Sequence, residues 1–537
     1  MRRYLPIVLL ALLVLAAACS GDIDATEAGD TEVAASSGGD DEVSGPGSDQ
    51  LRLAFNAEMQ PPDPDVFYEV EGNMVTQSLY EGLVVYEPDS PEIVPQLAES
   101  WEVGDDGLTY TFTLREGVTV HDGTPMDAEA WVTSFERRLA VDAAPAYMLA
   151  DVDEAVAVDE YVFEVTLAAP SSAFLDYLAA PYGPRAISPS ALAEHDAGDE
   201  AQGYLAATSA GTGPYRIDSW DPTDAYRLVA FDDYWGDPPA ITDVEITIMP
   251  DTASQRLALE EGDLDIVTHG LPVADVEALA ARDDLTVHTF PVTQKTVLSV
   301  NPNRPPFDDP EVRTALRGAF DRSAIIEDVF GDQADTSTQM YPAQSLPEGL
   351  GTDAWDYDPS ALAGLVADLD DVTLDIAYSQ DEGGSLPRMA EILAAELDEL
   401  GLEAGVRGMP ISQVFELPAL DPGEQPDLLL WRFNPDAVHP DTWARIFYIT
   451  DGAVNFLNAS VPDADEAMDE GLAAVDPDAV DEAYGRAGEL MAEDGTFLSF
   501  ANNRDVMVAR ADLAGLTHWL AAPYTLRLAD LRFQGDA

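Results

Sequence analysis

The stretch at residues 97–139, LAESWEVGDDGLTYTFTLREGVTVHDGTPMDAEAWVTSFERRL, determines how the rest of the sequence is interpreted. From Leu108 to Leu114, apolar residues alternate with threonines, which is the period-two pattern of a half-buried strand. The GDDG at residues 104–107 has the composition of a turn, because Gly accepts positive φ and Asp bonds its own backbone. We therefore expect a hairpin that joins this strand to a shorter one at residues 101–103.

A helix is predicted after the second break in this stretch, HDGTP at residues 121–125. Trp131, Phe135 and Leu139 fall four residues apart and share one helical face. Asp127 precedes them and can cap the free amides of the first turn. A hairpin followed by a capped helix is a folding unit and carries no catalytic group.

The same residues carry a family resemblance. LAESW, LTY, LREGV and HDGTP occur in this order between residues 97 and 125. They resemble the signature of the bacterial extracellular solute-binding proteins of family 5, the receptors of peptide, nickel and some oligosaccharide ABC importers. Further similar segments, including GTGPY at 211–215 and VRTAL at 312–316, extend the resemblance over the body from about residue 51 to about residue 528.

The resemblance implies an α/β, two-lobed periplasmic-binding-protein-like fold with a hinge and an extra subdomain in the first lobe. Alternating strand-like and helix-like stretches also favour an α/β protein. By resemblance, lobe 1 takes residues 51–292 plus 497–537, with the subdomain at about 91–200, and lobe 2 takes residues 293–496. A ligand that contacts both lobes then shifts the population toward the closed form.

The N-terminus is predicted to be a leader and a tether. Residues 1–18 combine Arg2 and Arg3 with an apolar run too short to span a bilayer, which is typical of a lipoprotein signal peptide. Cys19 is the expected lipidation site, and an ordinary secretory signal with an incidental cysteine is the alternative. Residues 19–50 form an acidic tether that we expect to be disordered. The protein is then expected on the extracellular face of the cell membrane, in the periplasm if an outer membrane is present.

The charge balance of the chain is extreme, with 102 acidic against 25 basic residues and a net charge of −77. Without the nine acids of the tether and the two arginines of the leader, the body still carries a net charge of −70. Nucleic acid is excluded as a partner, because binding it requires a basic face. A salt-adapted extracellular protein is the interpretation we favour, and high solubility without a salt requirement is the alternative.

The loop that bears on the ligand is LLLWRFNPDAVHPDTW at residues 428–443, where a buried apolar strand leads into a polar segment broken by prolines. The resemblance implies that an Asp shortly after the matching Trp pairs with the ammonium group of a bound peptide. Here Asn434 lies three residues after Trp431, and the nearest acid is Asp436. Either Asp436 takes this role, or the ligand has no ammonium group; Asn434 alone offers a neutral acceptor, about half as strong as a charge-assisted one.

Three aromatic residues of this loop, Trp431, Phe433 and Trp443, are candidates to stack on a ligand, a sugar ring included. Core packing is the alternative for Trp431 and Trp443. His439 is a weak candidate nickel ligand, because the segment offers neither a Cys nor a second His. We expect no metal and no cofactor.

We make two further structural predictions for helical segments. The helix near residues 75–83 is predicted to end with Gly82 in the left-handed conformation. Arg313, Asp321 and Arg322 are predicted to pair on an exposed helical surface.

An enzyme is the rival class, together with a surface adhesin or scaffold. The sequence holds no Gly-x-Ser-x-Gly, no His-Glu-x-x-His and a single cysteine, so we do not expect an enzyme. The prediction is a monomeric receptor that passes a small solute to an ABC permease, anchored to the membrane by lipid. Peptide is the favoured ligand, oligosaccharide the alternative, and nickel less favoured.

Self-repulsion among so many acids destabilises the compact state in dilute buffer, and molar salt screens it because the Debye length falls to about 3 Å. The melting temperature, followed by circular dichroism, is therefore expected to rise between dilute buffer and molar salt. An unchanged melting temperature contradicts the salt adaptation.

Overall fold

The computed structural model describes residues 49–369, 372–380, 384–452 and 454–534. The predicted signal peptide, the lipidation site Cys19 and nearly all of the tether lie outside these residues and stay predictions. In the part of the chain that is described, no helix has the length and the apolar character needed to cross a membrane.

The hairpin and capped helix of residues 97–139 are confirmed. Strand β4 (Ala98–Val103) pairs antiparallel with β5 (Thr109–Leu114), and Gly107 in the turn has φ 68°. Helix α2 (Ala128–Val141) begins at Asp127, whose carboxylate accepts the Ala130 N–H at 2.9 Å.

Two four-stranded sheets contribute to the largest hydrophobic cluster, which we call the core of lobe 1. One sheet has the order β4, β5, β7, β6, and the other has the order β1, β10, β9, β8. Only β1 and β10 pair in parallel in these two sheets. The remaining bounds are β1 Gln50–Phe55, β6 Val152–Asp159, β7 Val162–Leu167, β8 Tyr215–Trp220, β9 Ala225–Ala230 and β10 Asp243–Ile248.

Short helices and a small hairpin surround these sheets. The hairpin pairs β2 (Val84–Tyr86) with β3 (Ile93–Pro95). The helical bounds are α1 Asn73–Leu79, η1 Ala144–Leu149, α3 Phe174–Ala179, α4 Pro189–His195, α5 Gln202–Leu205, α6 Thr252–Glu261 and α7 Val273–Ala280.

The expectation for Gly82 was wrong. Helix α1 ends at Leu79, Tyr80 caps it in an extended conformation with φ −133°, and Gly82 is not in the left-handed region. Gly82 is needed for another reason: a Cβ there would lie 2.6 Å from the Arg185 guanidinium. The glycine permits a close tertiary approach that sequence periodicity does not reveal.

Lobe 2 is built on part of a seven-stranded sheet that extends into lobe 1, with the order β11, β17, β12, β16, β14, β15, and with β13 paired to β17; its edge strand β11 belongs to lobe 1. Strand β14 runs parallel to both β15 and β16. The bounds are β11 Ile266–Val267, β12 Leu285–Val300, β13 Ala334–Thr336, β14 Thr373–Ser379, β15 Glu403–Met409, β16 Leu428–Phe433 and β17 Phe497–Arg510.

Helices cover this sheet, so that β16 is buried on both faces. Leu428 and Leu430 belong to one hydrophobic cluster, and Leu429 and Trp431 belong to another. This explains the continuous apolar run LLLW, because a strand buried on both faces does not alternate. The helices are α8 Pro310–Ala319, α9 Arg322–Phe330, α10 Pro359–Val366, α11 Ser385–Glu399, α12 Ile411–Glu416, α13 Asp441–Phe447, α14 Pro462–Ala473 and α15 Pro477–Asp494.

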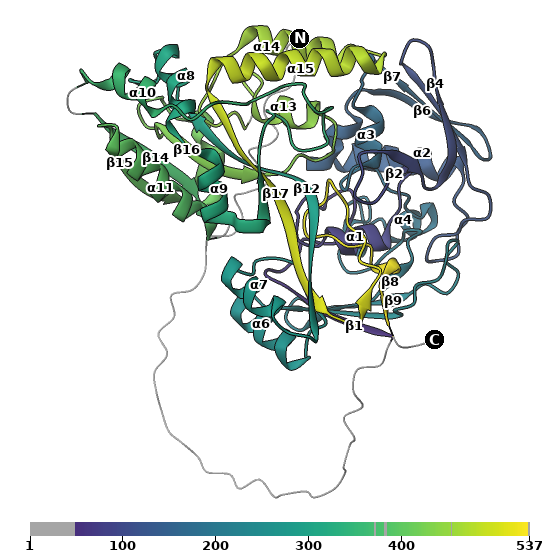
Figure 1. The fold of residues 1–537 in the computed structure, drawn as a ribbon. Coiled ribbons are helices and arrows are strands. Elements are labelled where there is room, and N and C mark those ends of the chain that lie inside the picture. Colours follow the sequence, from purple (N-terminus) through teal and green to yellow (C-terminus); the bar gives the residue numbers. More distant parts are fainter. Residues whose placement is uncertain (1–48, 370–371, 381–383, 453, 535–537) are drawn as a thin grey trace, which may run out of the picture. The chain divides into compact units, whose positions relative to one another are not determined.

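Two long antiparallel strands, β12 and β17, connect the lobes and run side by side through the ribbon (Figure 1). Their pairing is interrupted between Pro291 and Lys295. Beyond this gap, Val297 and Leu298 lie in the clusters of lobe 2. An interrupted ladder has fewer hydrogen bonds to resist bending, so we expect the hinge at this gap.

The return crossing lies inside β17. Phe497 and Ala501 belong to the clusters of lobe 2, whereas Met507 belongs to the core of lobe 1. We therefore move the proposed return to lobe 1 from Phe497 to a point between Ala501 and Met507, and the other boundaries stay as predicted.

The expectation for Arg313 and Arg322 was wrong. Both side chains are buried: Arg313 pairs with Asp494 at 2.8 Å, and Arg322 lies 3.8 Å over the Trp355 ring. Asp321 caps α9 by accepting the Ala324 N–H. The two arginines join α8 and α9 to distant segments, and the three residues do not pair with one another on a surface.

Lys295, the chain's single lysine, is fully buried on β12 beside the gap. Its ammonium donates to Ser337 Oγ at 2.6 Å, to the Gln339 carbonyl at 3.0 Å and to Asn502 Oδ1 at 3.0 Å. Burial lowers the pKa of Lys295 from 10.5 to about 7, because the charged form loses its hydration.

Replacing Lys295 by Met tests this burial through the pH dependence of unfolding. Between pH 7 and 10.5 the folded wild type binds fewer protons at Lys295 than the unfolded chain does. Its stability relative to the variant should therefore rise with pH, by at most about 1.4 kcal/mol per unit. Urea unfolding across this range measures the difference, and parallel curves contradict the prediction.

Candidate ligand-binding site

The segment at residues 434–440 leaves the carboxyl end of β16, at the edge that β16 shares with the parallel strands β14 and β15. Ligands of α/β proteins bind beyond the carboxyl ends of parallel strands. The segment also reaches the other lobe. Ala437 and Val438 are part of the core of lobe 1, and the Val438 N–H donates to the Tyr86 hydroxyl at 3.0 Å.

Asp436 is the charged group of this segment that meets lobe 1. The hydroxyls of Tyr68 and Tyr147 both donate to its Oδ2, at 2.5 and 2.6 Å. Only 8 % of Asp436 is exposed. Both tyrosines come from lobe 1, so one carboxylate oxygen holds the two lobes together at this point.

The second carboxylate oxygen of Asp436, Oδ1, receives no hydrogen bond from the described residues, and it is not among their fully enclosed polar atoms. A buried carboxylate normally fills both oxygens with donors. Asp436 therefore has an acceptor available for a donor that is not part of the folded chain.

Burial of the ionised Asp436 carboxylate costs free energy. Burial raises the pKa of Asp436 above its usual value, and the hydrogen bonds from Tyr147 and Tyr68 offset part of that rise. Burial and the nearby Asp436 carboxylate also raise the pKa of Tyr68 well above 10.0, so its hydroxyl remains a donor. A cation beside Oδ1 would further favour the ionised carboxylate.

A third tyrosine completes the surroundings. The ring of Tyr182 packs edge-on against Tyr68, with the centroids 4.8 Å apart. The site is thus a carboxylate from lobe 2 framed by phenol rings from lobe 1.

The structure places Trp431 and Trp443 in the core of lobe 2. Both indoles are fully buried, their centroids lie 5.6 Å apart, and the Trp431 Nε1–H donates to Ser299 Oγ at 2.8 Å. No face of either ring is left for a ligand, so this structure favours the packing alternative. Phe433 is half-buried at the end of β16 and remains a candidate contact.

Asn434 and His439 take other roles in the segment. The Asn434 side-chain amide donates to the Pro435 carbonyl at 3.2 Å. His439 Nδ1 accepts the Asp441 N–H at 3.2 Å, and burial lowers the pKa of His439 to about 3. Asp441 is itself occupied by Arg445 and Tyr484. Among the residues predicted for the ligand, Asp436 is the one that the structure brings to lobe 1.

The tyrosines around Asp436 were not predicted. Tyr68 follows the break PPDP at residues 61–64, and Tyr147 and Tyr182 lie in unrelated parts of the sequence. No spacing connects these positions to residue 436, because tertiary folding alone brings them together. The proline-rich break before Tyr68 was the available signal, since binding residues lie disproportionately on loops.

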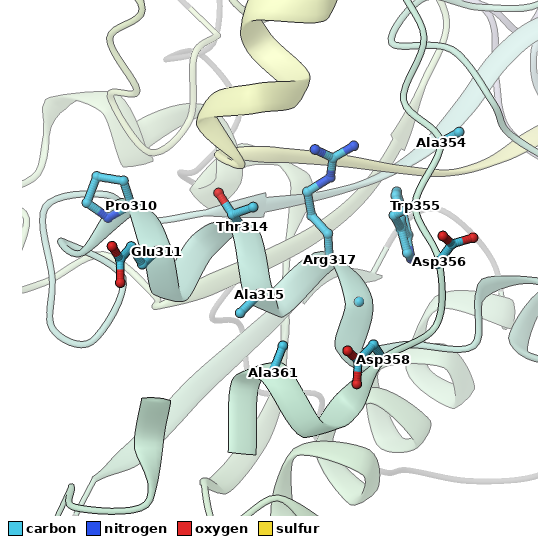
Figure 2. Close-up of a pocket in the computed structure, with 11 residues that line it drawn as sticks. Pro310, Glu311, Thr314, Ala315, Arg317, Ala354, Trp355, Asp356, Asp358 and Ala361 are labelled. Carbon is cyan, nitrogen blue, oxygen red and sulfur yellow. The ribbon is translucent and has the colours of Figure 1, made fainter. Parts of the chain in front are cut away.

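A surface pocket of about 530 Å³ lies elsewhere in lobe 2. Figure 2 shows its lining on α8, on the chain at residues 354–358 and at Ala361 of α10. Its Arg317 is already held by Asp353. The pocket contains none of the predicted ligand residues.

Comparison with known proteins identifies relatives over most of the chain. A family model described as "Bacterial extracellular solute-binding proteins, family 5 Middle" matches residues 92–455. A probable D,D-dipeptide-binding periplasmic protein, DdpA of Escherichia coli (strain K12), is 28% identical over 470 residues, covering 84% of this chain and 88% of that protein. Di/tripeptide-binding protein 2 of Pseudomonas aeruginosa (strain UCBPP-PA14) is 30% identical over 393 residues, covering 68% of this chain and 72% of that protein.

A solved structure shows the same fold. The ABC transporter substrate-binding protein CtaP of Listeria monocytogenes superposes with a TM-score of 0.81 at 20% identity, covering 90% of this chain and 99% of that chain. The predicted α/β, two-lobed architecture is confirmed.

Replacing Tyr68 by Phe removes one of the two hydroxyls that join Asp436 to lobe 1. A hydrogen bond to a charged group contributes about 1.5–3 kcal/mol, so without added ligand the open form should gain about tenfold or more over the closed form. The radius of gyration from solution scattering is expected to increase.

Tyr177→Phe is the matched control for this change, because the Tyr177 ring packs on Tyr147 but its hydroxyl makes no hydrogen bond to a described residue. Equal radii for wild type and Tyr68→Phe would show that the contact does not hold the lobes together.

Proposed function

Because this chain belongs to family 5 of the bacterial extracellular solute-binding proteins, we propose that it is the substrate-binding receptor of an ABC importer and captures short peptides between its lobes. The names of its relatives support this ligand class, since two of them are described as binding dipeptides or di- and tripeptides. The proposed activity is binding and delivery, without catalysis.

The observation that carries the proposal is the geometry of Asp436. A buried carboxylate at the meeting point of the lobes keeps Oδ1 available while Oδ2 is held by Tyr68 and Tyr147. The ammonium group at the N-terminus of a peptide supplies the charge and the donors that this oxygen lacks. Every peptide with a free N-terminus has this group, so the site can hold peptides of different sequence.

Ligand capture follows from the contacts across the lobes. A peptide whose ammonium group lies against Asp436 has lobe 2 on one side and the tyrosines of lobe 1 on the other. It binds the closed form better than the open form and shifts the population toward closure by that difference in affinity. Bending takes place in β12 and β17, at the interruption after Pro291.

An oligosaccharide is the second candidate, and the aromatic arrangement argues against it. Sugar rings stack on exposed aromatic faces, whereas Trp431 and Trp443 are fully buried. Nickel is disfavoured because His439 Nδ1 already accepts a backbone amide.

The remaining parts of the proposal concern the setting of the receptor. Lipid attached to Cys19 anchors the chain on the extracellular face of the membrane, and residues 19–50 tether the body. A monomer in the closed form then docks on its permease. Support for this comes from the leader-like composition of residues 1–18 and from the family.

Replacing Asp436 by Asn tests the anchor. The variant keeps an acceptor of the same shape but loses the charge, and a charge-assisted bond is roughly twice as strong as a neutral one, so affinity for a dipeptide or tripeptide with a free N-terminus should fall about tenfold or more. The Nα-acetylated form of the same peptide should bind the wild type weakly and show little further change in the variant. Titration calorimetry measures all four pairs.

Asn434→Ala is the matched control and should keep the affinity of the wild type, since its amide contacts the neighbouring backbone. An effect of Asn434→Ala alone would move the anchor to that residue, and no effect of either change would refute the site. A sugar or a metal ion found by native mass spectrometry in the purified protein would overturn the peptide assignment.

A further inference from the structure

Arg138, on α2, has a guanidinium group that is completely buried and whose N–H groups all donate hydrogen bonds. Its Nε donates to Asp65 Oδ1 at 2.8 Å. Its other two nitrogens donate to the backbone carbonyls of Pro64 at 2.9 Å, Pro145 at 3.3 Å, Tyr182 at 2.7 Å and Gly183 at 3.0 Å. A guanidinium group has five N–H donors, so none of them is left over.

The acceptors of Arg138 belong to three separate segments of lobe 1. Pro64 and Asp65 precede Tyr68, Pro145 precedes Tyr147 in η1, and the third segment contains Tyr182 itself. These are the three tyrosines that surround Asp436: two donate to its carboxylate, and the third packs against Tyr68. One side chain therefore fixes the backbone beside every ring of the site.

We propose that Arg138 is a positioning residue of the ligand site, which sets the phenol groups of Tyr68 and Tyr147 at the distance that leaves Asp436 Oδ1 ready for the ligand. It acts through four backbone carbonyls and the Asp65 carboxylate, and it does not touch the ligand. This inference rests on the proposed function, because it names what prepares the ammonium anchor.

The chemistry of the guanidinium group explains why an arginine and not a lysine suits position 138. Three loops must be held at one point, and a planar fork with five donors reaches five acceptors in fixed directions. Lysine has the same charge but three donors from one point, so it leaves at least two of the five acceptors without a partner. Small displacements of a binding residue weaken recognition strongly, because the geometry of a hydrogen bond tolerates little error.

The neighbouring Arg137 provides the contrast. It is also buried, and it pairs with Asp63 at 2.6 Å and with Asp65 at 2.6 Å. Its remaining bond goes to the Glu200 carbonyl at 2.8 Å, away from η1 and from Tyr182. Arg137 thus shares the charge, the burial and the acidic partners of Arg138 but holds only one of the three tyrosine segments.

The test compares Arg138→Lys with Arg137→Lys in the full chain. For each protein, calorimetry gives the affinity for one tripeptide with a free N-terminus and for its Nα-acetylated form. The ratio of these affinities measures recognition of the ammonium group. Both variants should lose stability, but only Arg138→Lys should lower the ratio, by about tenfold, the loss expected when a hydrogen bond to a charged group is misplaced.

A second measurement does not depend on any ligand. Tyrosine labelled with carbon-13 at Cζ reports the hydrogen bonding of each phenol by NMR, with Tyr68→Phe and Tyr147→Phe used to assign the two signals. Arg138→Lys should move both signals, and Arg137→Lys should leave the Tyr147 signal unchanged.

The outcomes separate this inference from the proposed function. A wild type that does not distinguish the two peptides refutes the ammonium anchor, while the NMR comparison still decides the role of Arg138. A wild type that distinguishes them, with the same ratio in Arg138→Lys, refutes the positioning role alone. An equal decrease of the ratio in both variants also refutes the positioning role, because a general loss of structure then explains the weaker recognition of the ammonium group.

A charge-balanced pair of variants covers the case in which Arg138→Lys does not fold. Arg138→Gln with Asp65→Asn removes one positive and one negative charge from the buried cluster, and Arg137→Gln with Asp63→Asn removes the same from the other side. Removing both partners avoids an unpaired buried charge. The affinity ratio and the NMR signals are then compared between these two proteins. The pair that lacks Arg138 should lower the ratio and move both tyrosine signals, and the pair that lacks Arg137 should leave the ratio and the Tyr147 signal unchanged.

Discussion

The antiparallel pairing of β12 with β17 is the constraint on which the rest of this structure depends. Each strand starts in the clusters of one lobe and ends in those of the other, so the two lobes share a single ladder of backbone hydrogen bonds. The ladder joins the lobes, and its interruption after Pro291 is where we expect them to bend. A continuous ladder would resist bending, whereas a flexible linker would not return the lobes to one closed arrangement.

The ligand site is possible because this constraint brings an acid of lobe 2 against tyrosines of lobe 1. Burying a carboxylate costs free energy unless donors compensate it. The structure provides compensation for one oxygen of Asp436, and in the proposed function the other oxygen accepts from the ammonium group of the solute. With this anchor, the free energy of closure would depend on the charge of what lies between the lobes, which is the property that the proposed receptor requires.

The interior of lobe 1 supports this arrangement at a distance from the ligand. Arg137 and Arg138 neutralise Asp63 and Asp65 in a buried cluster, although the chain as a whole is overwhelmingly acidic. These two basic residues are thus placed where they organise backbone segments. The same holds in lobe 2, where Lys295 on β12 and Arg322 beside β17 are buried and were not recognisable as interior residues. Their spacing resembles that of surface residues, and only their tertiary partners distinguish them.

The sequence by itself determined the local structure: the hairpin and capped helix of residues 97–139, the doubly buried strand at Leu428 to Trp431, and through them the family and the two-lobed fold. Periodicity, turn composition and capping act between neighbours in the chain, so they can be read without coordinates. Tertiary structure alone decided which residues form the candidate site. It buried Trp431 and Trp443, and it brought Asp436 to Tyr68 and Tyr147, which are hundreds of positions away. Contacts between such distant residues leave no pattern in the sequence, because they arise only when the lobes are packed.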